Sequence, residues 1–481
     1  MNESEREVAQ LVLPAVRWHP DRGFHDTWPA IERALAAGVR GFILFGGEAG
    51  SVRDLTDEMR RRANGPLLFA SDLERGAGQQ FRGATPLPPS AAIGWLNDLE
   101  VTRRAAEITA REARALGTGW VLAPVADLDL EPRNPIVATR AWHREPVPAA
   151  RQVESWVRGC AEGGALSCLK HFPGAGRATT DSHTELPVVT ANREELERGL
   201  LPFRAGIAAG ADTVMVGHLA YPTIDPSGIP ASRSATIVDR LLRRTLHFDG
   251  IVATDAINMA GFAKTGGGQS AVVEAVLAGC DALLYPEDTE STIATLAEAV
   301  RQGALNRERV REAVRRLGRA AARVGAPLGA APGRPEDLRW AFEVAVRTIH
   351  VLRGEARLGE ARVHLVELDD DQGGPHPAPP RTALKQALHD GGVELAEGAP
   401  MLLALYADVR AWKGRAGLSA AAIARASELL ATSPEAVVVL FGHPRQAEEL
   451  PAARNVVVAW GGEPLMQRAA AAWLLAGRAA G

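Results

Sequence analysis

Short apolar segments alternate with longer polar segments along the first two thirds of the chain. The apolar segments are rich in Val, Ile and Leu, and the segments between them, such as 26–38, 99–117 and 237–244, combine Ala, Arg and Glu in the manner of helices. Strands that are apolar throughout and separated by helices are typical of a parallel sheet buried on both faces. The predicted strands lie at 10–16, 41–46, 65–72, 119–127, 165–172, 212–218, 250–255 and 281–286.

Eight strand–helix units within about 320 residues predict an α/β fold of the (β/α)8 TIM-like barrel type. The alternative is an open, doubly wound sheet that binds a dinucleotide. No G-x-G-x-x-G sequence follows the first predicted strand, so a dinucleotide site has little support. We therefore favour the barrel.

The pattern changes between residues 325 and 340, where Gly, Ala and Pro are dense and a linker is expected. A second α/β series follows, with a Pro-rich acidic loop predicted over 369–382. Its predicted strands are 348–353, 362–368, 401–408, 435–442 and 455–461, and its predicted helices include 418–431 and 464–478. This series predicts a smaller three-layer α/β sandwich. We expect two domains, a catalytic barrel over 1–330 and the sandwich over 340–481.

Composition excludes several classes of protein. The chain has 54 basic and 58 acidic residues, a net charge of −4, which does not fit a nucleic-acid partner. No run of 18 apolar residues occurs, so no membrane span is expected. The polar start MNESEREVAQ does not resemble a secretory signal, which favours a cytoplasmic location. Cys160, Cys168 and Cys280 are scattered and form neither a disulfide framework nor a zinc motif.

Candidate chemistry lies where the apolar segments end, because barrel enzymes carry their catalytic groups at the carboxyl ends of the strands. The polar residues at these ends are Asp72, Asp127, Lys170, His171, His218 and Asp255. A single Asp in such a place is usually a helix cap or a turn residue. Several charged groups converging on one barrel mouth cost stability unless they serve a site. Lys170 is also one of only four lysines in a chain whose basic residues are otherwise arginine.

The segment KHFPGAGRATTDSHTELP, residues 170–187, places Asp181 two residues before His183. A carboxylate that accepts a hydrogen bond from one imidazole nitrogen leaves the other nitrogen to exchange a proton. The alternative is an Asx turn with an exposed histidine. The length of the loop and its small residues favour a lid that covers a site, rather than an Asx turn. Asp255, in GIVATDAINM, could likewise be a helix cap instead of a catalytic carboxylate.

These motifs closely resemble the bacterial β-N-acetylglucosaminidases of glycoside hydrolase family 3. The resemblance rests on 170–187, on ATDAINM at 253–259, and on the segments 72–81, 123–142 and 214–222. It implies a retaining, exo-acting hydrolase that removes terminal β-linked N-acetylglucosamine by double displacement, with no metal and no organic cofactor. Muropeptide fragments from peptidoglycan recycling and chitin fragments are the implied substrates.

The resemblance also implies a role for individual residues. Asp255 is expected to be the nucleophile, and His183 paired with Asp181 the acid/base. The expected sugar ligands are Asp72, Arg140, Lys170, His171 and His218. Arg140 could instead form a structural ion pair. Ala77, Gln80 and Ala175 depart from the arginines and histidine usual in the family, so aryl or chitobiose-like glycosides are as plausible as muropeptides.

Three other functions remain open. An imidazole base carries no negative charge once deprotonated, so a phosphate acceptor, and hence a phosphorylase, is compatible with His183. A β-glucosidase is a second alternative, although such relatives typically take their acid/base from a later domain and lack the Asp-Ser-His sequence. A non-catalytic carbohydrate-binding protein is the third, against which the intact Asp255, Asp181 and His183 argue.

Overall fold

The protein is described here by a computed structural model that covers residues 3–263, 270–329, 331–355, 358, 361–371, 377–410 and 413–476. Within these residues, eight parallel strand segments form the barrel predicted from the sequence. They are β1 Val12–Leu13 with β2 Ala15–Arg17, β3 Gly41–Phe45, β4 Leu68–Ser71, β5 Trp120–Val121, β6 Cys168–Phe172, β7 Thr213–Val216, β8 Ile251–Ala256 and β9 Ala282–Leu284.

The barrel closes at two places. The segment β1–β2 pairs with β9 through Leu13 and with β3 through Ala15, on either side of Pro14. Parallel bridges from Trp120 to Leu166 and from Val125 to Lys170 join β5 to the β6 segment. Closure leaves the carboxyl ends of all strands around one mouth, which is where a barrel places its active site.

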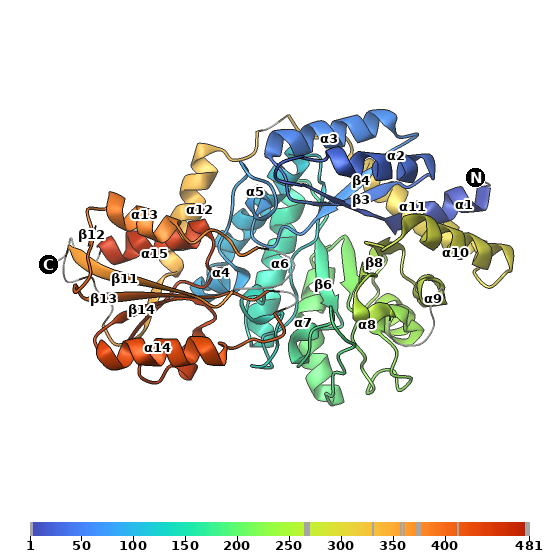
Figure 1. Ribbon diagram of the computed structural model, residues 1–481. Coiled ribbons are helices and arrows are strands. Elements are labelled where there is room, and N and C mark those ends of the chain that lie inside the picture. The colour runs from blue at the N-terminus through green and yellow to red at the C-terminus, as the bar shows by residue number, and fades with distance from the viewer. Residues whose placement is uncertain are drawn as a thin grey trace.

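Amphipathic helices cover the outside of the barrel (Figure 1). Within the described residues these are α1 Glu3–Ala9, α2 Trp28–Ala36, α3 Ala49–Arg62, α4 Ser90–Leu96, α5 Leu99–Ala115, α6 Pro146–Glu162, α7 Arg193–Ala208, α8 Ala260–Ala263, α9 Ser270–Ala278, α10 Thr289–Arg301 and α11 Arg307–Val324, with a π-helix at Thr236–Thr245. The caps are local, as at α5, where the Asp98 carboxylate accepts from the backbone N–H of Glu100 at 3.2 Å. None of the described helices is both long and apolar enough to cross a membrane.

The predicted linker is shorter than the composition indicated. Helix α12, Pro335–Thr348, begins inside the segment 325–340 that was expected to be irregular. Proline favours a helix start at the first helical position, because a backbone N–H there would have no partner within the helix. Glu336 and Asp337 follow in the first turn, where their negative charges interact favourably with the positive end of the helix dipole.

The second part of the chain lies at the left of Figure 1 and is a three-layer sandwich. Its described residues form one sheet in the order β10-β15-β14-β13-β11-β12, in which β10 is antiparallel to β15. The strands are β10 His350–Arg353, β11 Arg362–Asp369, β12 Glu394–Leu395, β13 Met401–Ala407, β14 Val437–Gly442 and β15 Asn455–Val458. The helices are α12, α13 Ala383–Asp390, α14 Ala420–Thr432 and α15 Pro464–Ala476.

The two faces of this sheet bury separate cores. One core contains residues of α12, α13 and α15, and the other contains residues of α14. Residues 372–376 of the predicted acidic loop, and the end of the predicted helix 464–478, lie outside the described residues. The domain boundaries 1–330 and 340–481 stay a prediction.

Candidate active site

Charged side chains continue the inward-facing rows of the barrel strands. Ile43, Ala70, Cys168 and Ala253 pack together inside the barrel. Side chains two positions apart in a strand point to the same face, so the next inward positions are Phe45, Asp72, Lys170 and Asp255. Lys170 and Asp72 confirm this arrangement by touching across the mouth, with 2.7 Å between Nζ and Oδ1. Strand geometry therefore brings the predicted strand-end residues together.

One side of the mouth is an ionic network built on Glu74. Its Oε1 lies 2.7 Å from Lys170 Nζ, and both carboxylate oxygens accept from Arg140, at 2.9 Å from Nε and 2.8 Å from Nη2. The side chains of Lys170 and Glu74 are only 2% and 8% exposed. Arg140 thus forms the ion pair that the sequence left as an alternative, while 29% of its side chain stays exposed.

The network keeps its members charged. Burial by itself lowers the pKa of Lys170, but the negative charges of Asp72 and Glu74 outweigh burial and raise it. Burial raises the pKa of Glu74, and the charges of Arg140 and Lys170 outweigh it and hold that pKa well below its usual range. Glu74 lies in the segment 72–81, two residues after Asp72, yet nothing in the sequence singled it out as the centre of the network.

His171 is oriented by Asp127. The Asp127 carboxylate lies 2.6 Å from His171 Nδ1 and also accepts from the backbone N–H of His171 at 3.2 Å and of Ala175 at 2.6 Å. An ionised Asp127 can only accept, so Nδ1 carries a proton and Nε2 faces the site, 3.4 Å from Arg140 Nη2. The peptide bond between Lys170 and His171 is cis. The strand-end position of Asp127 was the signal that could have identified it as a site residue.

Asp181 and His183 form a second carboxylate–imidazole pair. The Asp181 oxygen Oδ1 accepts from the His183 backbone N–H at 2.9 Å and lies 2.6 Å from Nδ1. Asp181 is buried, whereas 26% of the His183 side chain is exposed. The loop is held by a bond from the Gly261 N–H to the Ser182 carbonyl, 3.1 Å long. The expected Asp–His geometry is therefore present, and whether the loop acts as a lid stays a prediction.

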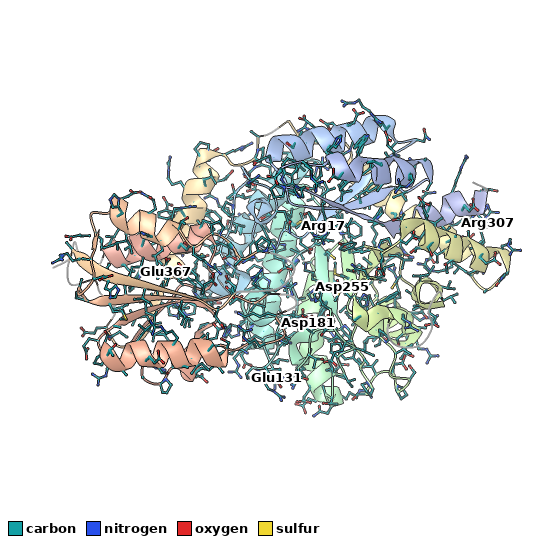
Figure 2. The ribbon with its side chains drawn as sticks, viewed as in Figure 1. Arg17, Glu131, Asp181, Asp255, Arg307 and Glu367 are labelled. Carbon is teal, nitrogen blue, oxygen red and sulfur yellow. The ribbon has the colours of Figure 1, made fainter. Side chains whose placement is uncertain are left out.

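Asp255 lies near the end of β8 (Figure 2), and its carboxyl interacts electrostatically with three histidines. Burial raises the pKa of its carboxyl, but the charges of His171, His218 and His183 outweigh burial, so the pKa is lowered. One oxygen also accepts from the Ala256 N–H at 2.8 Å. Asp255 is consequently ionised near neutral pH, as a nucleophile requires.

His218 differs from the expected sugar ligand. It is fully buried, with Nδ1 2.8 Å from the Ser232 hydroxyl and Nε2 3.1 Å from the Ala256 carbonyl oxygen. The carbonyl can only accept, so Nε2 carries the proton and Nδ1 accepts from Ser232. Both ring nitrogens have protein partners, and in this structure His218 supports the end of β8 instead of offering a free nitrogen.

The three residues that depart from the family pattern pack against or hydrogen-bond to other parts of the barrel. Ala77 is fully buried. Gln80 accepts from the Gly46 N–H at 3.1 Å, and Ala175 contributes its N–H to Asp127. Among the described residues, no group of three or more His, Cys, Asp or Glu side chains is arranged to hold a metal ion.

The barrel and its mouth have the features of an α/β-barrel glycosidase. Residues 5–320 match the family described as the glycosyl hydrolase family 3 N terminal domain, and the chain belongs to this family. This match confirms the resemblance read from the motifs at 170–187 and 253–259.

Individual relatives agree with this assignment. The chain is 33% identical over 316 residues to a "Beta-N-acetylglucosaminidase/beta-glucosidase" of Cellulomonas fimi, covering 62% of this chain and 56% of the relative. It is 37% identical over 272 residues to a "Beta-hexosaminidase" of Xylella fastidiosa strain M23, covering 54% of this chain and 80% of the relative. The chain thus spans little more than half the length of the Cellulomonas relative.

The similarity also includes the second part of the chain. The structure of a glycoside hydrolase family 3 β-N-acetylglucosaminidase from Paenibacillus sp. str. FPU-7 superposes with a TM-score of 0.85 and 26% identity, covering 99% of this chain and 97% of that one. The barrel followed by an α/β sandwich is therefore an arrangement that this relative shares.

Proposed function

We propose that this protein is a retaining, exo-acting β-N-acetylglucosaminidase. The observation that carries the proposal is the pairing of buried Asp181 with partly exposed His183 in the mouth that also contains the ionised carboxylate of Asp255. A nucleophile and a separate proton carrier are the two groups that double displacement needs. The names of the Cellulomonas and Xylella relatives support the substrate class.

In the first step, Asp255 attacks the anomeric carbon and the bond to the leaving oxygen breaks. His183, as imidazolium, donates its Nε2 proton to that oxygen, while Asp181 holds Nδ1. In the second step, water attacks the glycosyl ester and gives its proton to neutral His183, which releases Asp255. An imidazole suits both steps because one ring nitrogen can donate a proton in the first step and accept one in the second.

The sugar hydroxyls are bound by the residues around the ionic network of Glu74. Asp72 and Arg140 are partly exposed, and His171 presents Nε2, so these three can contact substrate directly. Lys170 is buried and directs its ammonium between Asp72 and Glu74. Chitin fragments and muropeptides of the peptidoglycan-recycling kind are the natural glycosides we propose, in the cytoplasm.

The decisive measurement compares kcat/KM for p-nitrophenyl N-acetyl-β-glucosaminide and p-nitrophenyl β-glucoside. We expect the N-acetylglucosaminide to be the better substrate, because a pocket that hydrogen-bonds an amide penalises a sugar that lacks it. Asp255→Ala protein purified in parallel measures contaminating hydrolase. A preference for the glucoside would identify a β-glucosidase, and sugar binding without cleavage of either substrate would identify a carbohydrate-binding protein.

A phosphorylase is the second candidate, and the imidazole base favours it. Neutral His183 does not repel an anionic acceptor as a carboxylate base would. The hydrogen phosphate dianion would attack the anomeric carbon of the ester, break its bond to the Asp255 oxygen and leave as a glycosyl phosphate, with no proton to remove. Phosphorus NMR of the products, in phosphate and in chloride at equal ionic strength, distinguishes this reaction from hydrolysis.

A further inference from the structure

Arg17 lies at the mouth of the barrel, although the sequence did not single it out. It is the last residue of β2 and stands in register with Phe45 of β3. Phe45 and Tyr285 both pack against the apolar core inside the barrel, and Arg17 lies against both rings. Figure 2 labels Arg17 and Asp255 on the barrel. Arg17 therefore belongs to the uppermost inward layer, the layer that carries Asp72 and Asp255.

Aromatic contacts hold the Arg17 guanidinium in place. Its central carbon lies 4.3 Å from the centroid of the Phe45 ring and 5.0 Å from that of Tyr285. Arg17 Nε donates to the Tyr285 hydroxyl at 2.8 Å. A guanidinium that stacks on rings in this way is oriented before any ligand arrives, which lowers the entropy lost on binding.

Arg17 differs from the other cations of the mouth in its charge balance. Lys170 is paired with Asp72 and Glu74, and Arg140 is paired with Glu74. Across the part of the chain that the structure describes, Arg17 has no carboxylate within ion-pair distance, and its single hydrogen bond goes to the neutral Tyr285 hydroxyl. Its positive charge and the N–H groups of Nη1 and Nη2 are thus free for a ligand.

We propose that Arg17 is an oxyanion-binding residue of the active site, which takes a carboxylate or a phosphate group. Guanidinium groups bind both through parallel, charge-assisted hydrogen bonds. Two sources share this chemistry: a carboxylate on the leaving group of the substrate, or inorganic phosphate that accepts the sugar. The assignment rests on the proposed glycosidase function, which supplies the reaction that the anion joins.

Arg104 provides a matched control. It lies on α5, on the outside of the barrel, with its guanidinium carbon 4.8 Å from the centroid of the Trp340 ring. In the described residues it, too, has no carboxylate within ion-pair distance. Arg104→Gln therefore removes the same charge and the same kind of aromatic contact, away from the mouth.

Calorimetry with inorganic phosphate on the full-length protein, at constant ionic strength in chloride, tests the binding directly. Arg17→Gln is expected to weaken phosphate binding at least about tenfold, the size of a lost charge-assisted hydrogen bond. The phosphate affinity of Arg17→Lys should lie between those of wild type and Arg17→Gln, because lysine keeps the charge but lacks the planar guanidinium. The affinity of Arg104→Gln should match that of wild type. Equal binding by wild type and Arg17→Gln, or absence of binding by wild type, would overturn the proposal.

Kinetics then identify the source of the anion. One arm compares a p-nitrophenyl glycoside with its ring-carboxylated analogue, and the other compares rates with and without phosphate. Arg17→Gln should abolish the preference for the carboxylated substrate in the first case, or the phosphate effect in the second. If neither ratio changes, Arg17 has no part in the reaction and the proposal fails. If wild type cleaves no glycoside, the proposed function fails, while calorimetry still decides whether Arg17 binds oxyanions.

Discussion

The two sides of the barrel mouth are built on different physical principles. On the side where we propose sugar binding, Glu74, Lys170 and Arg140 form an ionic network whose charges do not change near neutral pH. On the catalytic side, Asp181 holds one nitrogen of His183, and Asp255 stands free of any cationic lysine or arginine partner among the described residues. Permanent charges suit the recognition of hydroxyl groups, whereas proton transfer needs a group that titrates near the working pH.

The two sides also differ in what supports them. Arg75, next to Glu74, forms an ion pair with Glu463 of the second part of the chain. Asp129, two residues after Asp127, pairs with Arg445 and lies 3.2 Å from His443 Nε2. The loop that carries His183 is instead hydrogen-bonded to α8 of the barrel. The sandwich thus supports the loops that carry the proposed sugar ligands.

Asp255→Ala is expected to have the largest effect on activity. Removal of a nucleophile should lower kcat by at least about 10⁴-fold, since the two-step route is lost. Asp288→Ala is the control, because Asp288 caps α10 by accepting from the Ser291 N–H at 3.0 Å. That change should cost about 1 kcal/mol of unfolding free energy and little rate. Activity of Asp255→Ala within tenfold of wild type would show that Asp255 is not the nucleophile.

His183→Ala should lower the rate of glycoside cleavage, and the loss should grow with the basicity of the leaving group. General acid catalysis contributes about 10²- to 10⁴-fold when the leaving oxygen is basic and little when it is activated. Pre-steady-state kinetics with a dinitrophenyl glycoside should show a burst of dinitrophenol. The glycosyl ester on Asp255 still forms, but the variant lacks the base that activates water to hydrolyse it. Asp181→Asn should show the same dependence on the leaving group with a smaller loss of rate. A uniform loss across leaving groups would contradict the acid/base role and indicate that His183 binds the sugar.

Glu74→Gln tests the ionic side through stability. Lys170 and Arg140 would lose their shared carboxylate in a buried site, which should lower the unfolding free energy by about 3 kcal/mol and reduce kcat/KM. Glu290→Gln breaks the exposed pair with Arg33, 3.0 Å long, and should cost less than about 1 kcal/mol. Denaturant unfolding of both variants makes the comparison, and equal losses would show that the network is no stronger than a surface pair.

The smallest expected effect concerns His218 and pH. Burial is the main cause of its lowered pKa, although the charge of Asp255 opposes it and that of His183 adds to it. The unfolded chain therefore binds a proton more readily, so this histidine removes stability as the pH falls below about 6.5. His218→Asn should show a smaller fall in Tm than wild type between neutral and mildly acidic buffer. An identical fall in Tm for both proteins would mean that other groups cause the pH dependence of stability.

Much of the fold follows from patterns that are local in the sequence. Buried parallel strands must be apolar along their whole length, so each of the eight barrel strands was visible as a run of Val, Ile and Leu. The start of α12 at Pro335 was missed because the surrounding Gly, Ala and Pro indicated a linker. The short strand β12, Glu394–Leu395, was missed as well, since two residues carry no periodicity.

The site divides in the same way. The polar residues that end the barrel strands were visible in the sequence. The pairing of Asp181 with His183 was visible as well, because these residues are only two positions apart. The partners of the strand-end residues come from distant parts of the chain, and the sequence did not indicate them. Glu74 meets Arg140 across 66 residues, Asp127 meets His171 across 44, and Arg17 meets Tyr285 across 268. A closed barrel brings strand ends together whatever their separation in the chain, and charge, tautomer and pKa depend on those neighbours.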